Sequence, residues 1–143
     1  MLWVTRERPK TDRVACPWLI RRFIDPEAEI AFVPADRVLD VAADTAARSF
    51  DAPGATFTHR DGLCSFEVLI EEFDLGSDPA LTRLAKIVHA ADIATDIATD
   101  PIAPGLLAMG IGSLLAESDD QRLLDRARFV YDALYEWCRL EVG

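Results

Sequence analysis

Two histidines with acidic residues close by are the residues in this sequence that could hold a metal ion. His59 and Glu67 both lie in the segment "THRDGLCSFE", and His89 and Asp92 lie in "IVHAADIATD". His89 and Asp92 are three apart, so on a helix their side chains share one face and could converge on one ion. Glu67 follows His59 closely enough to join it at a shared centre. Two imidazoles with carboxylates suit a divalent Mn, Fe or Zn ion, and two histidines with one carboxylate are typical of non-haem iron.

Such a metal could also support catalysis. If one coordination position stays open, the bound water becomes acidic and can act as a nucleophile. The alternative is that the histidines are ordinary surface or core residues. Acidic neighbours are common in a chain with 25 Asp and Glu residues, and no HxxxH or HExxH motif links the two histidines. Residue spacing leaves both interpretations open.

Arginines near the N-terminus form a second candidate site, for an anion. Arg13, Arg21 and Arg22 lie in "TDRVACPWLIRRFIDP", within the basic first segment of a chain whose formal net charge is −10. A guanidinium suits an oxyanion such as sulfate, phosphate or chromate. Adjacent helical residues point a quarter-turn or more apart, so we expect at most one of Arg21 and Arg22 to face a shared pocket. The alternative is salt bridging to Asp25, Glu27 or Glu29.

Cys16, in the same segment, is a candidate redox residue. A cysteine near a helix start and close to several cations could have a lowered pKa and some reactivity. No resolving cysteine is nearby in sequence, and cysteine commonly packs as a small buried hydrophobe, which is the interpretation we favour. The chain has three cysteines and no CxxC spacing. This pattern argues against a disulfide framework and favours reduced thiols in a cytoplasm.

The elements that must position these residues begin with two strands and a helix. Leu2–Arg6 and Glu29–Ala35 are β-prone runs, and the segment between them has helical character, with Asp12 as a capping residue. Pro17 lacks a backbone N–H and cannot sit in a helix interior, so we predict that the helix begins near Cys16. The β-α-β order favours parallel pairing of the two strands.

The rest of the chain is mainly helical. Further helices are predicted over residues 36–47, 65–75, 78–92, 101–116 and 119–140. Asp78 is the expected N-cap of the third of these. Tyr131 and Tyr135 are expected to pack with their hydroxyls bonded at the edge of the core. We therefore predict an α+β fold in one domain, residues 1–143, with a small sheet in the N-terminal half packed against a mainly helical C-terminal half.

Charge and hydropathy exclude several functions. The net charge of −10 disfavours nucleic-acid binding by this chain alone, because that binding depends on Lys and Arg neutralising phosphates. No apolar run approaches the roughly 18 residues that indicate a membrane span, and the N-terminus does not resemble a signal peptide. We expect a cytoplasmic protein without a membrane or nucleic-acid partner. Association with a second copy of the chain stays open.

Several segments together resemble the chromate-resistance family typified by ChrB. They are "WVTRERPKTDRVACPWLIRRFIDPEAEIAFVP", "HRDGLCSFEVLI" and "IVHAAD", and "YDALYEWCR" resembles the end of the family's sequences. The most specific part is "DRVACPWLIRRFID". Longer members carry an additional N-terminal region, so the chain resembles only their C-terminal domain. The matching polar positions are Asp12, Arg13, Cys16, Trp18, Arg21, Arg22, His59, Ser65, Glu67, His89 and Asp92.

The resemblance implies a bacterial protein from a chromate-resistance setting, with chromate or a similar oxyanion as a small partner. Two functions are then open. One is a metal-binding domain or metal-dependent enzyme, with an arginine orienting an anionic ligand. The other is a non-enzymatic oxyanion sensor or accessory domain of a transcription regulator, because longer members are described as chromate-sensing regulators. Chromate reduction by Cys16 is the weakest variant, since one thiol cannot deliver three electrons without a recycling partner.

Overall fold

A small parallel sheet forms the N-terminal part of the structure, a computed structural model that describes all 143 residues. The central strand is β1 (Leu2–Arg6), and β2 (Glu29–Val33) and β3 (Arg48–Ser49) pair with its two edges, both in parallel. Leu2 lies opposite Glu29 in this register. The two predicted strands and their parallel pairing are confirmed. β2 ends at Val33, before the predicted boundary, because Pro34 has no N–H to continue the ladder.

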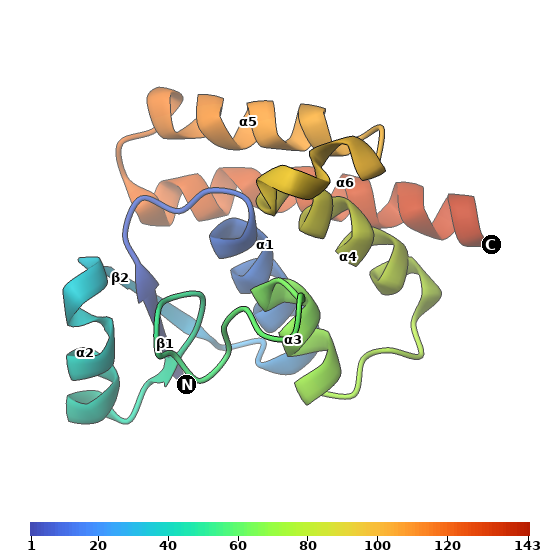
Figure 1. The fold of residues 1–143 in the computed structure, drawn as a ribbon. Coiled ribbons are helices and arrows are strands. Elements are labelled where there is room, and N and C mark those ends of the chain that lie inside the picture. The colour runs from blue at the N-terminus through green and yellow to red at the C-terminus, as the bar shows by residue number, and fades with distance from the viewer.

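Helices make up most of the remaining chain, as predicted, so the α+β class is confirmed. In Figure 1, α5 lies at the top with α6 beneath it in the view, α2 lies at the far side of the sheet, and α1, α3 and α4 fill the space between. α1 contacts α3, α4 and α6, and α4 also contacts α3 and α6 directly, so the four helices form one packed group. The helices are α1 (Asp12–Leu19), α2 (Val38–Thr45), α3 (Ser65–Glu72), α4 (Pro79–Asp92), α5 (Ala103–Ala116) and α6 (Asp120–Val142), with short 3-10 turns at Ala35–Arg37 and Ala94–Thr99.

α4 forms where its sequence signals place it. The Asp78 side chain accepts the backbone N–H groups of Ala80 and Leu81 at 2.9 and 3.2 Å, which caps the helix. Apolar side chains at helical spacing, among them Leu84 and Val88, are buried in the main core. The capped start and the buried stripe fix which face of α4 remains for polar side chains, among them His89.

The start of α1 differs from the prediction. α1 begins at Asp12, so Pro17 lies inside the helix. Without an N–H on Pro17, one carbonyl of the preceding turn loses its donor. The helix continues as a π turn, η1 (Ile20–Ile24), which closes when the Asp25 N–H donates to the Ile20 carbonyl at 2.6 Å. The early start has a tertiary cause, because the Asp12 carboxylate is bound by the first turn of α3.

The two tyrosines of α6 pack as expected. Tyr131 and Tyr135 are buried, and their hydroxyls donate to the Thr11 carbonyl at 3.3 Å and to Asp78 Oδ2 at 2.6 Å. They tie α6 to the starts of α1 and α4. None of the helices combines the length and the apolar character that crossing a membrane requires.

Candidate functional site

His59 lies in the loop before α3, and acidic groups from three separate segments surround its ring. Its Nε2 is 2.7 Å from Asp92 Oδ2 on α4 and 3.9 Å from Asp12 Oδ2 on α1. Its Nδ1 is 3.1 Å from Ser65 Oγ and 3.3 Å from Asp51 Oδ1. Both ring nitrogens are therefore oriented by fixed partners, although the side chain is 41% exposed.

His89, on α4, has a similar environment built from other residues. Its Nδ1 is 2.5 Å from Glu67 Oε1 on α3, and its Nε2 is 2.7 Å from Asp96 Oδ2 in the turn after α4. Glu67 is held in place by the start of its own helix, since its carboxylate accepts the Cys64 N–H at 3.0 Å in a capping box. The capping arrangement of α3 thus fixes a carboxylate against His89.

We call His59, Glu67, His89 and Asp92 the histidine seam. The structure brings these four residues to facing parts of α3, α4 and the loop before α3, but as two pairs: His59 with Asp92, and His89 with Glu67. Two groups have potential ligand atoms within 4.8 Å of one another: Asp12, His59 and Asp92, and Cys64, Glu67 and His89. Glu67 contacts His89, and neither of the two groups contains both Glu67 and His59.

Four residues that were not among the predicted ligands also contact the seam. Asp51 and Asp12 face His59, while Asp96 and Cys64 adjoin the pair of His89 and Glu67. Asp12 carried a signal, because it belongs to the most specific family-like segment. Asp51 carried none, since its contact with His59 depends on the loop that follows β3.

Burial and crowding shift the protonation equilibria around His59. Burial, with the nearby charges of Asp51 and Asp92, raises the pKa of Asp12 to about 8. The hydrogen bond to Asp51, with that to Asp92, raises the pKa of His59 to about 9. Burial also raises the pKa of Asp92. Several carboxylates therefore compete for one imidazole, and a cation among them would relieve their mutual repulsion.

His89 is affected in the same direction. Burial alone would lower its pKa, but the hydrogen bonds to Asp96 and Glu67 outweigh burial, so the pKa is raised. The contacts of both imidazoles thus shift their protonation equilibria toward the charged form. A metal ion binds neutral imidazole, so an ion entering the seam would displace protons.

Cys16 does not have the reactive environment considered from the sequence. Its side chain is fully buried and its Sγ donates to Asp12 Oδ1 at 3.3 Å. Burial and the adjacent Asp12 carboxylate raise its pKa, so the lowered value considered above is wrong. Burial likewise raises the pKa of Cys64. All three cysteines are free and buried, which agrees with the favoured packing role for Cys16.

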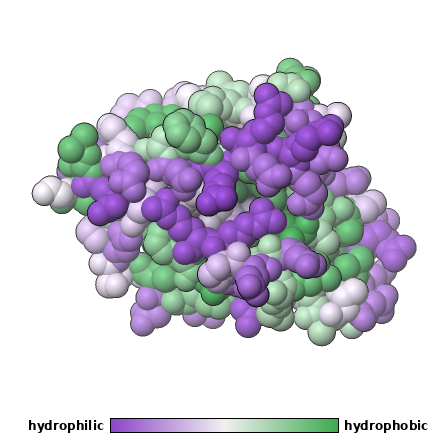
Figure 2. Space-filling model, turned by 180° about the vertical axis from the view of Figure 1, so that it is seen from behind, coloured by the Kyte–Doolittle hydropathy of each residue, from purple (hydrophilic) through white to green (hydrophobic).

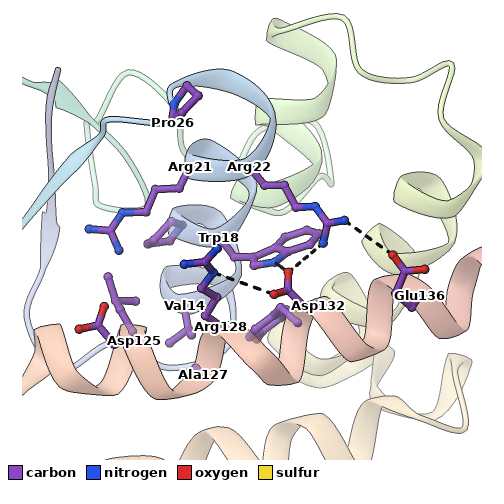
Figure 3. A pocket seen from close by; sticks show the side chains of 13 residues that line it. Val14, Trp18, Arg21, Arg22, Pro26, Asp125, Ala127, Arg128, Asp132 and Glu136 are labelled. Atoms are coloured by element: carbon purple, nitrogen blue, oxygen red, sulfur yellow. Dashed lines mark hydrogen bonds and ion pairs between the residues drawn. The ribbon is translucent and has the colours of Figure 1, made fainter.

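The three arginines of the predicted anion site are separated. Arg13 Nε lies 3.4 Å from Asp51 Oδ2, and its Nη1 donates to the carbonyls of Arg6 and Glu7. Arg21 and Arg22 instead lie at η1, where they line a hollow of about 620 Å³ between η1 and α6 (Figure 3). Both arginines reach this hollow, so the expectation of one at most is wrong. The π turn and the length of the two side chains allow it.

Arg22 forms ion pairs with acidic residues of α6. Its guanidinium is 2.8 Å from Asp132 and 3.7 Å from Glu136, and the Trp18 Nε1–H also donates to Asp132 at 2.8 Å. Arg21 makes one hydrogen bond, from Nε to the Ala28 carbonyl at 3.2 Å, and no ion pair. The predicted alternative of salt bridges to nearby acidic residues is also wrong, because the acidic partners of Arg22 come from the far end of the chain.

Comparisons with known proteins agree with the resemblance noted in the sequence. The family model described as "ChrB, C-terminal domain" matches residues 3–138. Protein ChrB of Cupriavidus metallidurans is 42% identical over 134 residues, which cover 93% of this chain and 39% of that protein. The chain therefore spans well under half the length of this relative. No solved structure matches the chain.

Proposed function

Since this chain belongs to the family of ChrB C-terminal domains, the chromate-resistance family that its motifs resemble, we propose that its histidine seam binds a divalent transition-metal ion. The proposed ligands are the imidazoles of His59 and His89 and the carboxylates of Glu67 and Asp92, so binding of one ion requires the two pairs of the seam to share it. Nitrogen and carboxylate oxygen donors suit Mn, Fe or Zn.

The observation that carries this proposal is that the two ring nitrogens of each imidazole face different partners. Histidines that bind metals use one ring nitrogen for the ion and hold the other with a carboxylate or hydroxyl. His59 Nδ1 faces Ser65 and Asp51, and His89 Nε2 faces Asp96. The remaining nitrogens, His59 Nε2 and His89 Nδ1, are the ones that face the two proposed carboxylate ligands.

The charge balance also supports a cation. Asp12 is fully buried, and Asp51 and Asp92 are 5% and 18% exposed, so three carboxylates with little access to water surround one imidazole. Arg6 and Arg13 pair with Asp51, and the His59 imidazole is the cationic group that faces Asp12 and Asp92. A divalent ion would supply two positive charges where one imidazole now faces several carboxylates, and its preferred donors match those present.

Catalysis is the further step of this proposal. An ion with an open coordination position would acidify a bound water and could activate it for attack on a substrate. The partial exposure of His59 supports access of water and of a small substrate to this group. A metal-binding domain without catalysis requires the ligands but neither an open coordination position nor access for a substrate.

Metal analysis tests the proposal directly. Protein purified without a histidine tag, from medium supplemented with Mn, Fe and Zn, should contain a divalent metal by elemental analysis. His59→Gln and His89→Gln should lose most of it, while Asp44→Asn, an exposed position on α2, should retain it. Circular dichroism confirms that each variant is folded. A folded wild-type protein that neither contains nor takes up any of the three metals would refute the proposal.

Support for the small oxyanion expected from the sequence rests on Arg21, whose guanidinium makes no ion pair. In that role the chain would be a chromate sensor or an accessory domain of a transcription regulator. Calorimetric titration with chromate and with sulfate tests this second candidate, which requires binding that disappears in Arg21→Ala. We expect no shift of promoter DNA in a mobility assay with this chain alone.

A further inference from the structure

The hollow between η1 and α6 is separate from the histidine seam, because no seam residue lines it. The residues of α6 that border it lie along one side of that helix. η1 and the adjoining part of α1 form the other wall (Figure 3). α6 lies at the back of Figure 1, and the face seen from behind in Figure 2 has hydrophilic side chains gathered across its middle. The volume of about 620 Å³ is in the range of small-molecule sites.

The charged lining of this hollow is balanced. Three arginines and three acidic residues border it: Arg21, Arg22, Arg128, Asp125, Asp132 and Glu136. The chain as a whole has a net charge of −10, so a balanced set is a departure from the rest of the surface. A dianion such as chromate would meet three carboxylates here. A ligand that carries both a positive and a negative group would match the lining better.

Internal pairing leaves one charge of each sign without a partner. Asp132 is shared by Arg22 and Arg128, at 2.8 and 4.0 Å, and Glu136 lies 3.7 Å from Arg22. Arg21 has no ion pair, and Asp125 makes neither a hydrogen bond nor an ion pair. Figure 3 shows Arg21 and Asp125 at one end of the hollow, with the paired groups toward the other.

Apolar residues also line the hollow. Val14, Pro17, Leu124 and Ala127 form what we call the apolar wall, and the parts of them that reach the hollow could contact the hydrocarbon part of a ligand. A water molecule occupies about 30 Å³ in the liquid, so a single tetrahedral oxyanion would leave most of the space to solvent. It would stay largely hydrated beside one arginine, which gives little affinity. A larger molecule with an apolar part uses both the volume and the wall.

We propose that the hollow binds a zwitterionic organic molecule, an α-amino acid or short peptide, with its carboxylate at Arg21 and its ammonium group at Asp125. The apolar side chain of the ligand packs against the wall formed by Val14, Pro17 and Leu124. The proposal concerns a second site and does not depend on metal binding in the seam.

Calorimetric titration with matched probes tests the assignment. The probes are L-leucine and leucyl-leucine, together with N-acetyl-L-leucine, which lacks the ammonium group, and L-leucinamide, which lacks the carboxylate. Wild-type protein should bind at least one of the two zwitterions. If it binds leucine, the affinity should be about tenfold higher than for N-acetyl-L-leucine or L-leucinamide, each of which keeps only one of the two charges. Chromate and sulfate are titrated alongside.

Two variants assign the groups. Asp125→Asn should weaken zwitterion binding about tenfold without weakening N-acetyl-L-leucine, and Arg21→Ala should do the same without weakening L-leucinamide. Asp44→Asn should bind as wild type. Metal content should be unchanged in all three variants, so loss of metal reports on the seam and not on the hollow. No binding of either zwitterion at millimolar concentration, equal binding by both variants and wild type, or binding of chromate or sulfate alone would each overturn the proposal.

Discussion

The carboxylate of Asp12 caps a helix other than its own: Oδ2 accepts the N–H of Ser65 at 2.8 Å, and Oδ1 accepts the N–H of Phe66 at 2.9 Å. The first residue of α1 is thereby bound to the first turn of α3, 53 residues later in the chain. Ser65 in turn contacts the ring of His59 through its Oγ. The position of the seam relative to α1 therefore depends on this buried carboxylate.

Replacing Asp12 by Asn should lower the free energy of unfolding by about 1–3 kcal/mol. An amide offers one oxygen where the carboxylate offers two, so one N–H of the α3 first turn loses its acceptor in a fully buried place. Urea unfolding followed by circular dichroism at about pH 9, where a carboxyl with a pKa of about 8 is mostly ionised, measures the effect. Asp44→Asn, on the exposed face of α2, should stay within about 0.5 kcal/mol of wild type, and equal losses in both variants would contradict the capping role.

The contacts of His59 predict a pH dependence for the metal-free protein. Its pKa rises from 6.5 to about 9 on folding, chiefly through the hydrogen bond to Asp51. The folded state therefore binds the proton more tightly, and the resulting stabilisation is complete below about pH 6.5 and is lost as the pH rises toward 9. The difference in urea midpoint between wild type and His59→Gln should shrink over this interval. Parallel curves between pH 6 and 10 would show that the imidazole charge contributes nothing.

Two aspartates on α6 that line the same hollow should differ in their effect on stability. Asp132 accepts from Trp18 and Arg22, whereas Asp125 makes no contact with either. Asp132→Ala leaves the Trp18 N–H without an acceptor in a largely buried position and should cost about 1–2 kcal/mol. Asp125→Ala should change the free energy of unfolding by less than about 0.5 kcal/mol. Equal effects in thermal or urea unfolding would mean that the Trp18 contact is not stabilising.

Two glycines in α5 should also separate in their response to alanine. A Cβ at Gly112 would meet nothing within 4 Å, whereas a Cβ at Gly110 would lie 3.0 Å from Lys10 Cγ and 3.4 Å from Thr11 Oγ1. Gly112→Ala should stabilise the protein by up to about 1 kcal/mol, the usual difference in helix propensity. Gly110→Ala should gain less or lose stability, because the segment around Lys10 must shift. Thermal unfolding of the two variants measures the difference, and the reverse order would be inconsistent with the packing of α5.

The thiols should be unreactive in the native protein. Cys16, Cys64 and Cys138 are buried, and their pKa values are raised, chiefly by burial. A water-soluble thiol reagent at neutral pH should modify none of them before unfolding and all three after it. Rapid native labelling of Cys16 would restore the redox role that its environment argues against.

The sequence determined the elements whose signals are local. Asp78 caps α4 and the apolar stripe lies within that helix, so residue spacing was sufficient to predict α4, and the same holds for the packing of Tyr131 and Tyr135 on α6. Parallel pairing of the first two strands followed from their order along the chain. The rule that excludes proline from helix interiors failed at Pro17, because the anchoring of Asp12 by α3 outweighs the loss of one hydrogen bond.

Tertiary structure decided which charged groups meet. The sequence identified His59, Glu67, His89 and Asp92 as candidates, but the pairing of His59 with Asp92 depends on how α4 packs beside the loop before α3. Arg22 and Asp132 are 110 residues apart, and no spacing rule connects them. The reason is physical: helical periodicity sets the direction of a side chain from its own axis, while its partner is set by the packing of that axis against others.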